Sequence, residues 1–152
     1  MIPTDRRNIF KTAFATAAGL FAVRSSTTAA RADTSTIQKA VYHLSDAEKV
    51  ASVLGNIRNH IEGMGGSQNV RIAVVVHGTA LKSFIAETAN SNIKSRVISA
   101  ANDGVALHAC ANTMAAQGVV VADLLPGFVV AEKGGVVRLV ELQQDGYLYL
   151  RP

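Results

Sequence analysis

A run of seven residues, 70–76, limits the possible folds of this chain more than any other feature. It has the sequence VRIAVVV, which is almost continuously apolar and rich in β-branched side chains. Such a run is typical of a strand covered on both faces, because a strand with one face in water alternates apolar and polar residues. Strands of this kind belong to parallel sheets with helices packed on either side. The run therefore predicts an α/β domain.

The rest of the chain alternates between short apolar runs and helical patterns. Further strands are predicted at residues 37–44, 105–109, 128–131 and 147–150. The clearest helix follows residues 45–48, whose sequence SDAE fits a capping box, and its apolar face holds Val50, Val53, Leu54, Ile57 and Ile61. Other helices are predicted at residues 79–88, 93–101, 112–117 and 136–144. Residues 90–92 offer caps for the second of these, whose apolar side is predicted to hold Ile93, Val97, Ile98 and Ala101. This order predicts one three-layer α/β/α domain with a mostly parallel five-stranded sheet.

The first 32 residues differ from the rest of the chain in charge and in pattern. They hold five basic side chains and one acidic one, whereas residues 33–152 hold ten of each. Arg6-Arg7 precedes a short apolar stretch at residues 12–23, and Ala30-Arg31-Ala32 fits a signal-peptidase site, as in a twin-arginine export signal. Twelve apolar residues are too few for a membrane span, which needs about 20. We expect cleavage before Asp33 and a periplasmic protein of residues 33–152, the alternative being an N-terminal amphipathic helix that is kept.

The charge balance and the motifs exclude several functional classes. Residues 33–152 have no net charge, so no nucleic-acid partner is predicted. The single cysteine excludes a disulfide scaffold. The chain has no GxGxxG after its first strand and no GxxxxGK[ST], so we expect no dissociable cofactor. His77, His108, Cys110 and Met114 have the ligand types of a type-1 copper site, but no histidine lies between Cys110 and Met114 as is usual there. Copper binding therefore remains only a third hypothesis.

Three side chains capable of chemistry lie at the carboxyl ends of three predicted strands: His43, His77 and Cys110. Ligands of open α/β sheets bind at that edge. Cys110 comes two residues before Asn112, the predicted N-cap of a short helix whose positive end would favour a thiolate. His77 or His43, if close, could assist by hydrogen bonding. The alternatives are that Cys110 is a small buried apolar residue and that His108 is a hydrogen-bonded core histidine.

Five segments taken together resemble the DsrE/DsrF/TusD-type sulfur-relay family, and most closely its exported branch. They are VYHLSDAEK at 41–49, VVVHG at 74–78, ACANTM at 109–114, DLLPG at 123–127 and GYLYLRP at 146–152. The resemblance covers residues 36–152. It implies a flavodoxin-like subunit that forms homo-oligomers, commonly trimers or hexamers. In relay members a cysteine at the position of Cys110 accepts a sulfane sulfur as a persulfide and passes it to a partner protein.

Carried over to this chain, the resemblance implies that Cys110 is the sulfur carrier and that Asn112 and Thr113 line its pocket. His77 as an assisting group and His43 as a pocket residue follow from their strand-end positions instead. The first hypothesis is therefore a periplasmic protein that binds or transfers sulfane sulfur through a Cys110 persulfide. Since the chain has no second cysteine, it would need a separate periplasmic donor or acceptor. The second hypothesis is a non-catalytic oligomeric module that binds a small ligand and in which Cys110 is incidental.

Overall fold

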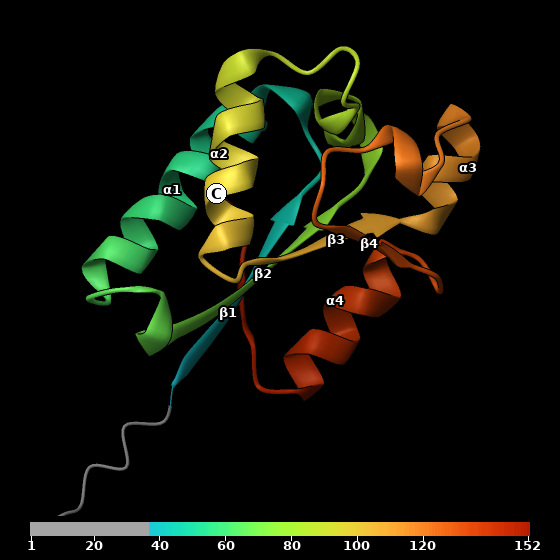
Figure 1. The fold of residues 1–152 in the computed structure, drawn as a ribbon. Helices are drawn as coiled ribbons and strands as arrows, with labels where there is room; N and C mark the ends of the chain where they lie inside the picture. Colours follow the sequence, from blue (N-terminus) through green and yellow to red (C-terminus); the bar gives the residue numbers. More distant parts are fainter. Residues whose placement is uncertain (1–36) are drawn as a thin grey trace, which may run out of the picture. The chain divides into compact units, whose positions relative to one another are not determined.

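The computed structural model describes residues 37–152, so the predicted export signal lies outside the described residues. Five strands form a single sheet in the order β4-β3-β2-β1-β5, and every neighbouring pair is parallel (Figure 1). The strands are β1 (Gln38–Leu44), β2 (Val70–Val76), β3 (Ala106–Cys110), β4 (Phe128–Ala131) and β5 (Leu148–Leu150). The predicted five-stranded α/β fold is confirmed, and the sheet is wholly parallel.

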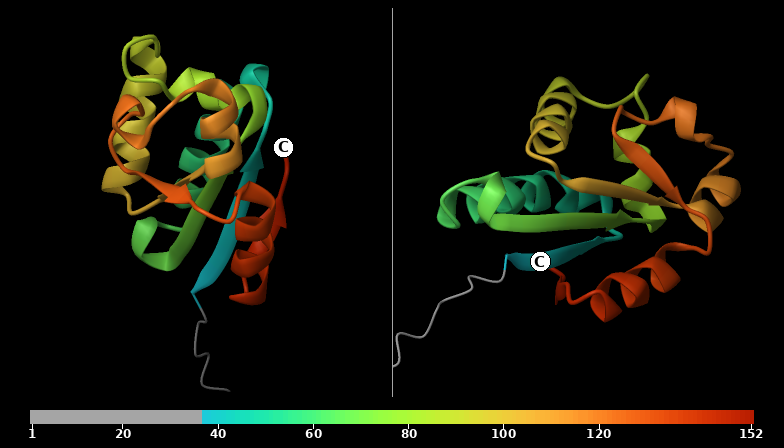
Figure 2. Two further views of the ribbon diagram at one scale, coloured as in Figure 1. Left: turned by 90° about the vertical axis from the view of Figure 1, so that its right-hand side faces the viewer. Right: turned by 60° about the horizontal axis from the view of Figure 1, so that its bottom comes forward.

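Helices cover both faces of the sheet, as Figure 2 shows: α1 and α2 lie on one face and α4 on the other. Their bounds are α1 (Val50–Gly63), α2 (Ser91–Asn102) and α4 (Gly135–Gln144), and the short α3 (Ala111–Gln117) follows β3 directly. The chain steps from β1 to β4 in one direction and then returns across the sheet to place β5 beside β1. Because such crossovers are right-handed, the returning step places α4 on the opposite face from α1 and α2. None of the helices within residues 37–152 is long and apolar enough to cross a membrane.

The core has a large layer under α1 and α2 and a small one under α4. All five residues predicted for the apolar face of α1 are buried in the large layer. The small layer consists of Val41, Ala73, Val75, Leu139 and Leu142, with Tyr147 at its margin. Of the seven residues of β2, six are buried and only Arg71 is exposed. The expectation that this strand is covered on both faces is confirmed.

The predicted capping box before α1 is wrong. The Ser45 hydroxyl donates to Asp46 Oδ2 (3.0 Å), and no side chain of this segment caps the 3-10 turn η1 (Ala47–Lys49) that precedes α1. The Ala47 N–H instead donates to Thr79 Oγ1 (3.1 Å), and the Thr79 hydroxyl donates to the Ser45 carbonyl (3.2 Å). A residue from the turn after β2 therefore performs the capping that a local motif was expected to perform.

Two helix predictions also need correction. The segment predicted as a helix at 79–88 is the 3-10 helix η3 (Gly78–Phe84), after which Ile85 forms an isolated antiparallel bridge with Leu124. In α2 the expected cap is present, since the Asn90 side chain accepts from the Ile93 N–H (2.9 Å). Ile98, however, is 50% exposed and does not belong to the buried face of α2.

Candidate functional site

The sequence predicts that His43, His77 and Cys110 lie together at one edge of the sheet. The structure places all three at that edge, but only the two histidine rings are hydrogen-bonded to each other. His43 is the second-last residue of β1, His77 follows β2, and Cys110 ends β3. Val76 pairs with Ala109, so the next residues, His77 and Cys110, occupy neighbouring positions on adjacent strands. The rings of His43 and His77 are hydrogen-bonded to each other through their Nε2 atoms. Among the described residues, no hydrogen bond joins either ring to Cys110.

The Cys110 thiol lies in a set of converging hydrogen-bond donors. The residue is only 6% exposed and is itself the N-cap of α3, a position predicted for Asn112. Burial raises the pKa of the Cys110 thiol, but hydrogen bonds from the Thr113 hydroxyl and from the backbone N–H groups of Thr113, Gly135 and Asn112 outweigh it and hold the pKa below its ordinary value. The site is therefore arranged to hold an anion on sulfur.

The Thr113 hydroxyl owes its orientation to the turn after β2. Thr113 Oγ1 accepts a hydrogen bond from the Gly78 N–H (3.3 Å), so its own proton is free to donate to the sulfur. Gln117 Nε2 donates to the Gly78 carbonyl (2.8 Å), which fastens the same turn to α3. The predicted pocket residue Thr113 thus contacts Cys110 and also links β2 to α3.

Gly135 brings a second helix N-terminus to the thiol. A Cβ atom at this position would lie 3.2 Å from Cys110 Cβ, 3.3 Å from Val75 Cγ1 and 3.6 Å from Cys110 Sγ. A side chain here would crowd Cys110 and Val75, so glycine lets α4 begin close to the sulfur and donate its first N–H without that crowding. Gly135 was not predicted from the sequence, because it lies 25 residues from Cys110 and carries no chemical group that marks it.

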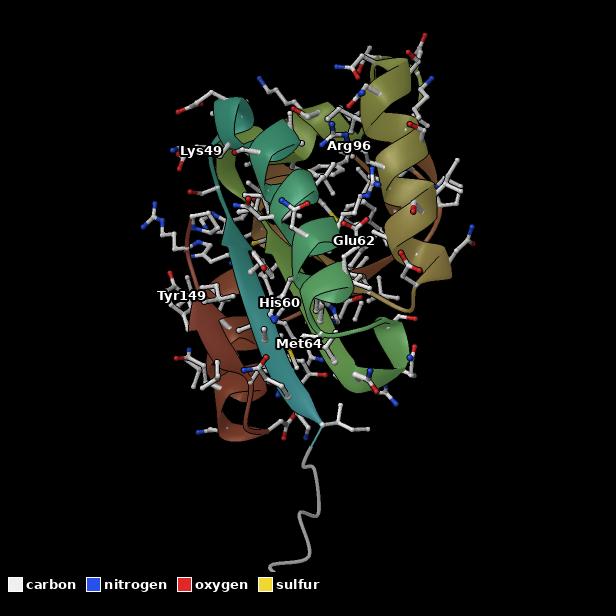
Figure 3. All side chains as sticks on the ribbon, turned by 90° about the vertical axis from the view of Figure 1, so that its left-hand side faces the viewer. Lys49, His60, Glu62, Met64, Arg96 and Tyr149 are labelled. Carbon is white, nitrogen blue, oxygen red and sulfur yellow. The ribbon has the colours of Figure 1, made fainter. Side chains whose placement is uncertain are left out.

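The histidine pair extends to Tyr149 of the edge strand β5. His43 Nδ1 lies 2.6 Å from the Tyr149 hydroxyl, which makes a chain of three hydrogen-bonding groups ending at a tyrosine that is 42% exposed. Figure 3 labels Tyr149 on this side of the molecule. Burial is the main cause that lowers the pKa of His43, and the charges of His77 and Arg151 lower it further. Burial is also the main cause that lowers the pKa of His77, and the charge of Arg151 adds to it. Both rings are consequently neutral near pH 7, so one can donate and the other accept.

The C-terminal residues complete this cluster. Arg151 Nη2 donates to Ser45 Oγ (3.3 Å) and lies 3.7 Å from Asp46 Oδ2. The cluster surrounds β1, which is flanked by β2 and by the returning strand β5, the point at which the strand order reverses. Open α/β sheets bind ligands at such points. Tyr149 and Arg151 belong to the segment GYLYLRP, which was predicted to contain a strand, and only its family likeness pointed to a functional role.

The residues considered as copper ligands do not form a metal site. Within residues 37–152 no group of three or more His, Cys, Asp or Glu side chains is placed to hold a metal ion. Met114 packs into the core layer under α1 and α2. His108 is buried as expected, but its Nε2 has no hydrogen-bond partner, so the expectation of a hydrogen-bonded core histidine is not met at that atom.

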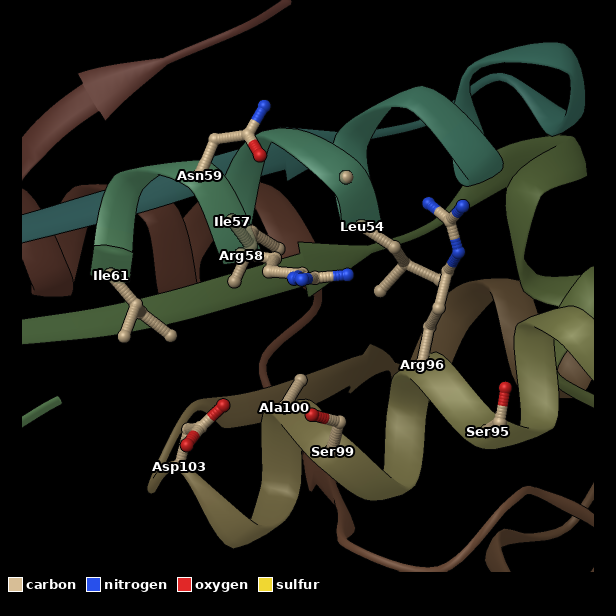
Figure 4. Close-up of a pocket in the computed structure, with 11 residues that line it drawn as sticks. Leu54, Ile57, Arg58, Asn59, Ile61, Ser95, Arg96, Ser99, Ala100 and Asp103 are labelled. Carbon is tan, nitrogen blue, oxygen red and sulfur yellow. The ribbon is translucent and has the colours of Figure 1, made fainter. Parts of the chain in front are cut away.

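A cavity of about 360 Å³ lies between α1 and α2 and is remote from this chemistry (Figure 4). Its floor is apolar, and the guanidinium groups of Arg58 and Arg96 extend into it. Arg58 pairs with Glu62 (2.7 Å), and Arg96 donates to the Ala51 carbonyl (3.1 Å). No residue of the carboxyl edge of the sheet lines this cavity, so we do not assign it to the candidate site.

Comparisons with known proteins agree with the fold just described. Three solved structures are similar over most of the chain. MTH1491 from Methanobacterium thermoautotrophicum is 29% identical, with 76% of this chain and 99% of that chain covered and a TM-score of 0.67. The ychN protein from E. coli is 17% identical (76% and 99% covered, TM-score 0.60), and BT1422 from Bacteroides thetaiotaomicron is 16% identical (78% and 98%, TM-score 0.59).

The last two likenesses show the fold alone, and a comparison with curated proteins finds no match. A family model described as the DsrE/DsrF-like family matches residues 33–152. That range contains all five strands, the Cys110 donor set and the histidine pair. The chain belongs to the DsrE/DsrF-like family.

Proposed function

We propose that this protein binds and transfers sulfane sulfur as a persulfide on Cys110. The family is generally linked to sulfur relay, and the observation that carries the proposal is the donor set around the thiol. Four donors, from Thr113, Asn112 and Gly135, converge on one sulfur atom in a buried setting. Such a set favours a thiolate as nucleophile and then an anionic persulfide as product, because hydrogen bonds to an ionised group are stronger than those to a neutral one.

The chemistry requires two displacement steps and no external oxidant. In the first, the Cys110 thiolate attacks the outer sulfur of a donor, an S–S bond to Cys110 forms, and the donor's leaving group departs with the electron pair. In the second, a thiolate of an acceptor protein attacks the terminal sulfur and the Cys110 thiolate leaves. The charge on sulfur is anionic before and after each step, which is what the fixed N–H groups stabilise.

The histidine pair is proposed to move protons for these steps. His77 directly follows β2 and lies at the position next to Cys110, and the neutral His77–His43–Tyr149 chain connects that position to an exposed tyrosine. A neutral ring can accept the proton of an incoming thiol or give one to a leaving group. Asn112 and Thr113 are proposed to hold the sulfur itself. His43 lies beyond His77 from the sulfur and is proposed to orient His77 through their hydrogen bond.

The periplasm is the proposed location, on the basis of the twin-arginine pattern at Arg6-Arg7 and the Ala30-Arg31-Ala32 site. With a single cysteine, the chain cannot resolve its own persulfide into a disulfide, so the acceptor is a second protein. The mass of the protein recovered from its own host tests the location. A chain that begins at Asp33 and is found in the periplasmic fraction is the expected result, and an uncut chain in the cytoplasm would refute it.

The test of function is the intact mass of the protein before and after exposure to polysulfide, with Cys110→Ser as the control. We expect wild-type protein to gain sulfur that a reductant removes, and the control to gain none. The competing candidate is the non-catalytic ligand-binding module, which the 6% exposure of Cys110 favours. A native wild-type protein that stays unmodified, although its urea-unfolded form is modified, would refute the carrier function and support that module.

A further inference from the structure

A second cavity, of about 270 Å³, lies on the face of the sheet that α4 covers. Its walls come from β3, β4, the turn between β4 and α4, and α4 itself. The polar residues that line it are His108, Glu132, Lys133, Arg138 and Glu141. This volume is several times the roughly 30 Å³ that a water molecule occupies in the liquid, so a small polyatomic ligand fits.

Two buried nitrogen atoms at this cavity have no hydrogen-bond partner. They are His108 Nε2 and Arg138 Nε, and they account for two of the three unpartnered buried side-chain atoms within residues 37–152. His108 is 7% exposed. A buried polar group without a partner is costly, and native proteins normally satisfy it with a ligand, an ion or an ordered water. Two such atoms on one cavity indicate a missing group with hydrogen-bond acceptors.

The charged groups at the cavity cancel one another, so we expect it to select a ligand by hydrogen bonds rather than by net charge. Glu141 accepts from Lys133 Nζ (3.1 Å) and from Arg138 Nη1 (3.2 Å), which leaves Arg138 Nε unused. Exposed Glu132, which also lines the cavity, brings the formal sum of the four charged groups to zero. Burial, followed by the charge of Arg138, lowers the pKa of His108 to about 4, so its ring is neutral near pH 7 and can present Nε2–H as a donor.

The cavity adjoins the sulfur site. His108 and Cys110 are two residues apart on β3, so they point to the same face of the sheet and lie roughly 7 Å apart along the strand. Ala131, a lining residue, is the register partner of Cys110. Gly134 also lines the cavity and immediately precedes Gly135, whose N–H donates to the sulfur. A ligand held at His108 is therefore next to the nucleophile.

We propose that this cavity binds a small oxyanion through Arg138 and His108 and, resting on the function proposed above, holds the sulfonate end of a thiosulfate-type sulfur donor. The Cys110 thiolate attacks the outer sulfur, the S–S bond of thiosulfate breaks, and sulfite leaves with the electron pair. One thiolate and one thiosulfate dianion become one persulfide anion and one sulfite dianion, so atoms and charge balance. Both nitrogens are covered without ligand, so binding includes a movement of the Arg138 side chain, which is 30% exposed.

The first experiment tests the oxyanion site without any sulfur chemistry. Full-length Cys110→Ser protein is titrated with sodium sulfate, against sodium chloride at equal ionic strength, while NMR follows the His108 ring. We expect sulfate alone to shift the His108 signals and to raise the pKa of His108, because the bound anion favours the protonated ring. Arg138→Gln should abolish the response, whereas Arg58→Gln, on the opposite face, should keep it. No response to sulfate, or an equal response in Arg138→Gln, overturns the proposal and leaves an ordered water as the occupant.

The second experiment compares the initial rates at which thiosulfate and polysulfide load Cys110. Only thiosulfate carries an oxyanion, so Arg138→Gln should lower the ratio of the two rates by at least tenfold, and Arg58→Gln should not change it. An unchanged ratio overturns the donor assignment while the persulfide function stands. If neither compound loads Cys110, the proposed function and the donor assignment both fail, and the sulfate titration still decides whether the oxyanion site exists. Should Arg138→Gln not fold, Arg138→Lys, which keeps the charge but lacks Nε–H, supplies the same comparison.

Discussion

Replacing Thr113 with valine removes one donor from the Cys110 thiol with almost no change in shape. The Thr113 hydroxyl donates to the sulfur and accepts from the Gly78 N–H (3.3 Å). A hydrogen bond to a charged group contributes about 1.5–3 kcal/mol. Since about 1.4 kcal/mol corresponds to one pKa unit, Thr113→Val should raise the pKa of Cys110 by about one to two. At any pH below both pKa values, the thiolate population should fall by about tenfold to a hundredfold.

The assay is the rate of alkylation of Cys110 as a function of pH, measured on wild type, Thr113→Val and Thr113→Ser. Serine keeps the hydroxyl, so its profile should remain close to that of wild type. The rate of sulfur loading at neutral pH should fall in the same proportion as the thiolate population. A Thr113→Val profile that coincides with wild type would show that the hydroxyl does not hold the sulfur anion, and the reasoning about the donor set would fail.

The same substitution has a predictable effect on folding stability. A thiol whose pKa is lowered in the folded state contributes stability that is complete above the unfolded pKa and is lost as pH falls through the folded pKa. The stability difference between wild type and Thr113→Val should therefore grow as pH rises. A constant part of about 1–3 kcal/mol should remain at all pH values, because the Gly78 N–H loses its acceptor. Urea denaturation across this pH range measures both parts.

Three further predictions concern the helix α4 and the buried histidine. Gly135→Ala should destabilise the protein by about 1–3 kcal/mol and raise the pKa of Cys110, because the new methyl group would lie 3.2 and 3.3 Å from the side chains of Cys110 and Val75. Thermal unfolding measures the destabilisation, and Gly63→Ala is the matched control because a Cβ there has nothing within 4 Å. The low pKa of His108, about 4, should cost about 3 kcal/mol of stability as pH falls from about 6.5 to 4, and urea unfolding of His108→Gln should show a shallower pH dependence. We expect light scattering to show a homo-oligomer, and we expect Val140→Asp to dissociate it, because Val140 is 48% exposed and lies beside two other exposed valines of α4. A wild-type protein that is monomeric would refute this prediction.

Local patterns in the sequence were sufficient for most of the elements. The apolar spacing from Val50 to Ile61 and the β-branched run of β2 reflect burial that each element makes on its own faces, so the period alone reveals them. Where a distant residue intervenes, local reasoning fails. The capping box at Ser45 is an example, because Thr79 occupies the position that the motif was expected to fill. The exposed Ile98 is another, because the width of the buried stripe on α2 depends on what packs against it.

The candidate site divides in the same way. The strand-end positions of His43, His77 and Cys110 were predictable, because parallel strands bring their carboxyl ends to one edge whatever their order. The partners of these residues were not. Tyr149 reaches His43 only because β5 pairs with β1, and Gly135 reaches Cys110 only because α4 begins above β3.

The sequence by itself determined the fold class, the number of strands and the chemistry available at the edge of the sheet, since residue type and short-range period encode these properties. The tertiary structure decided the strand order, the helix that supplies the last N–H to the thiol, and the pairing of the two imidazole rings. It also decided that His108 and Arg138, 30 residues apart, share one cavity. The physical reason is that these arrangements depend on which crossover returns across the sheet, and no local pattern records that choice.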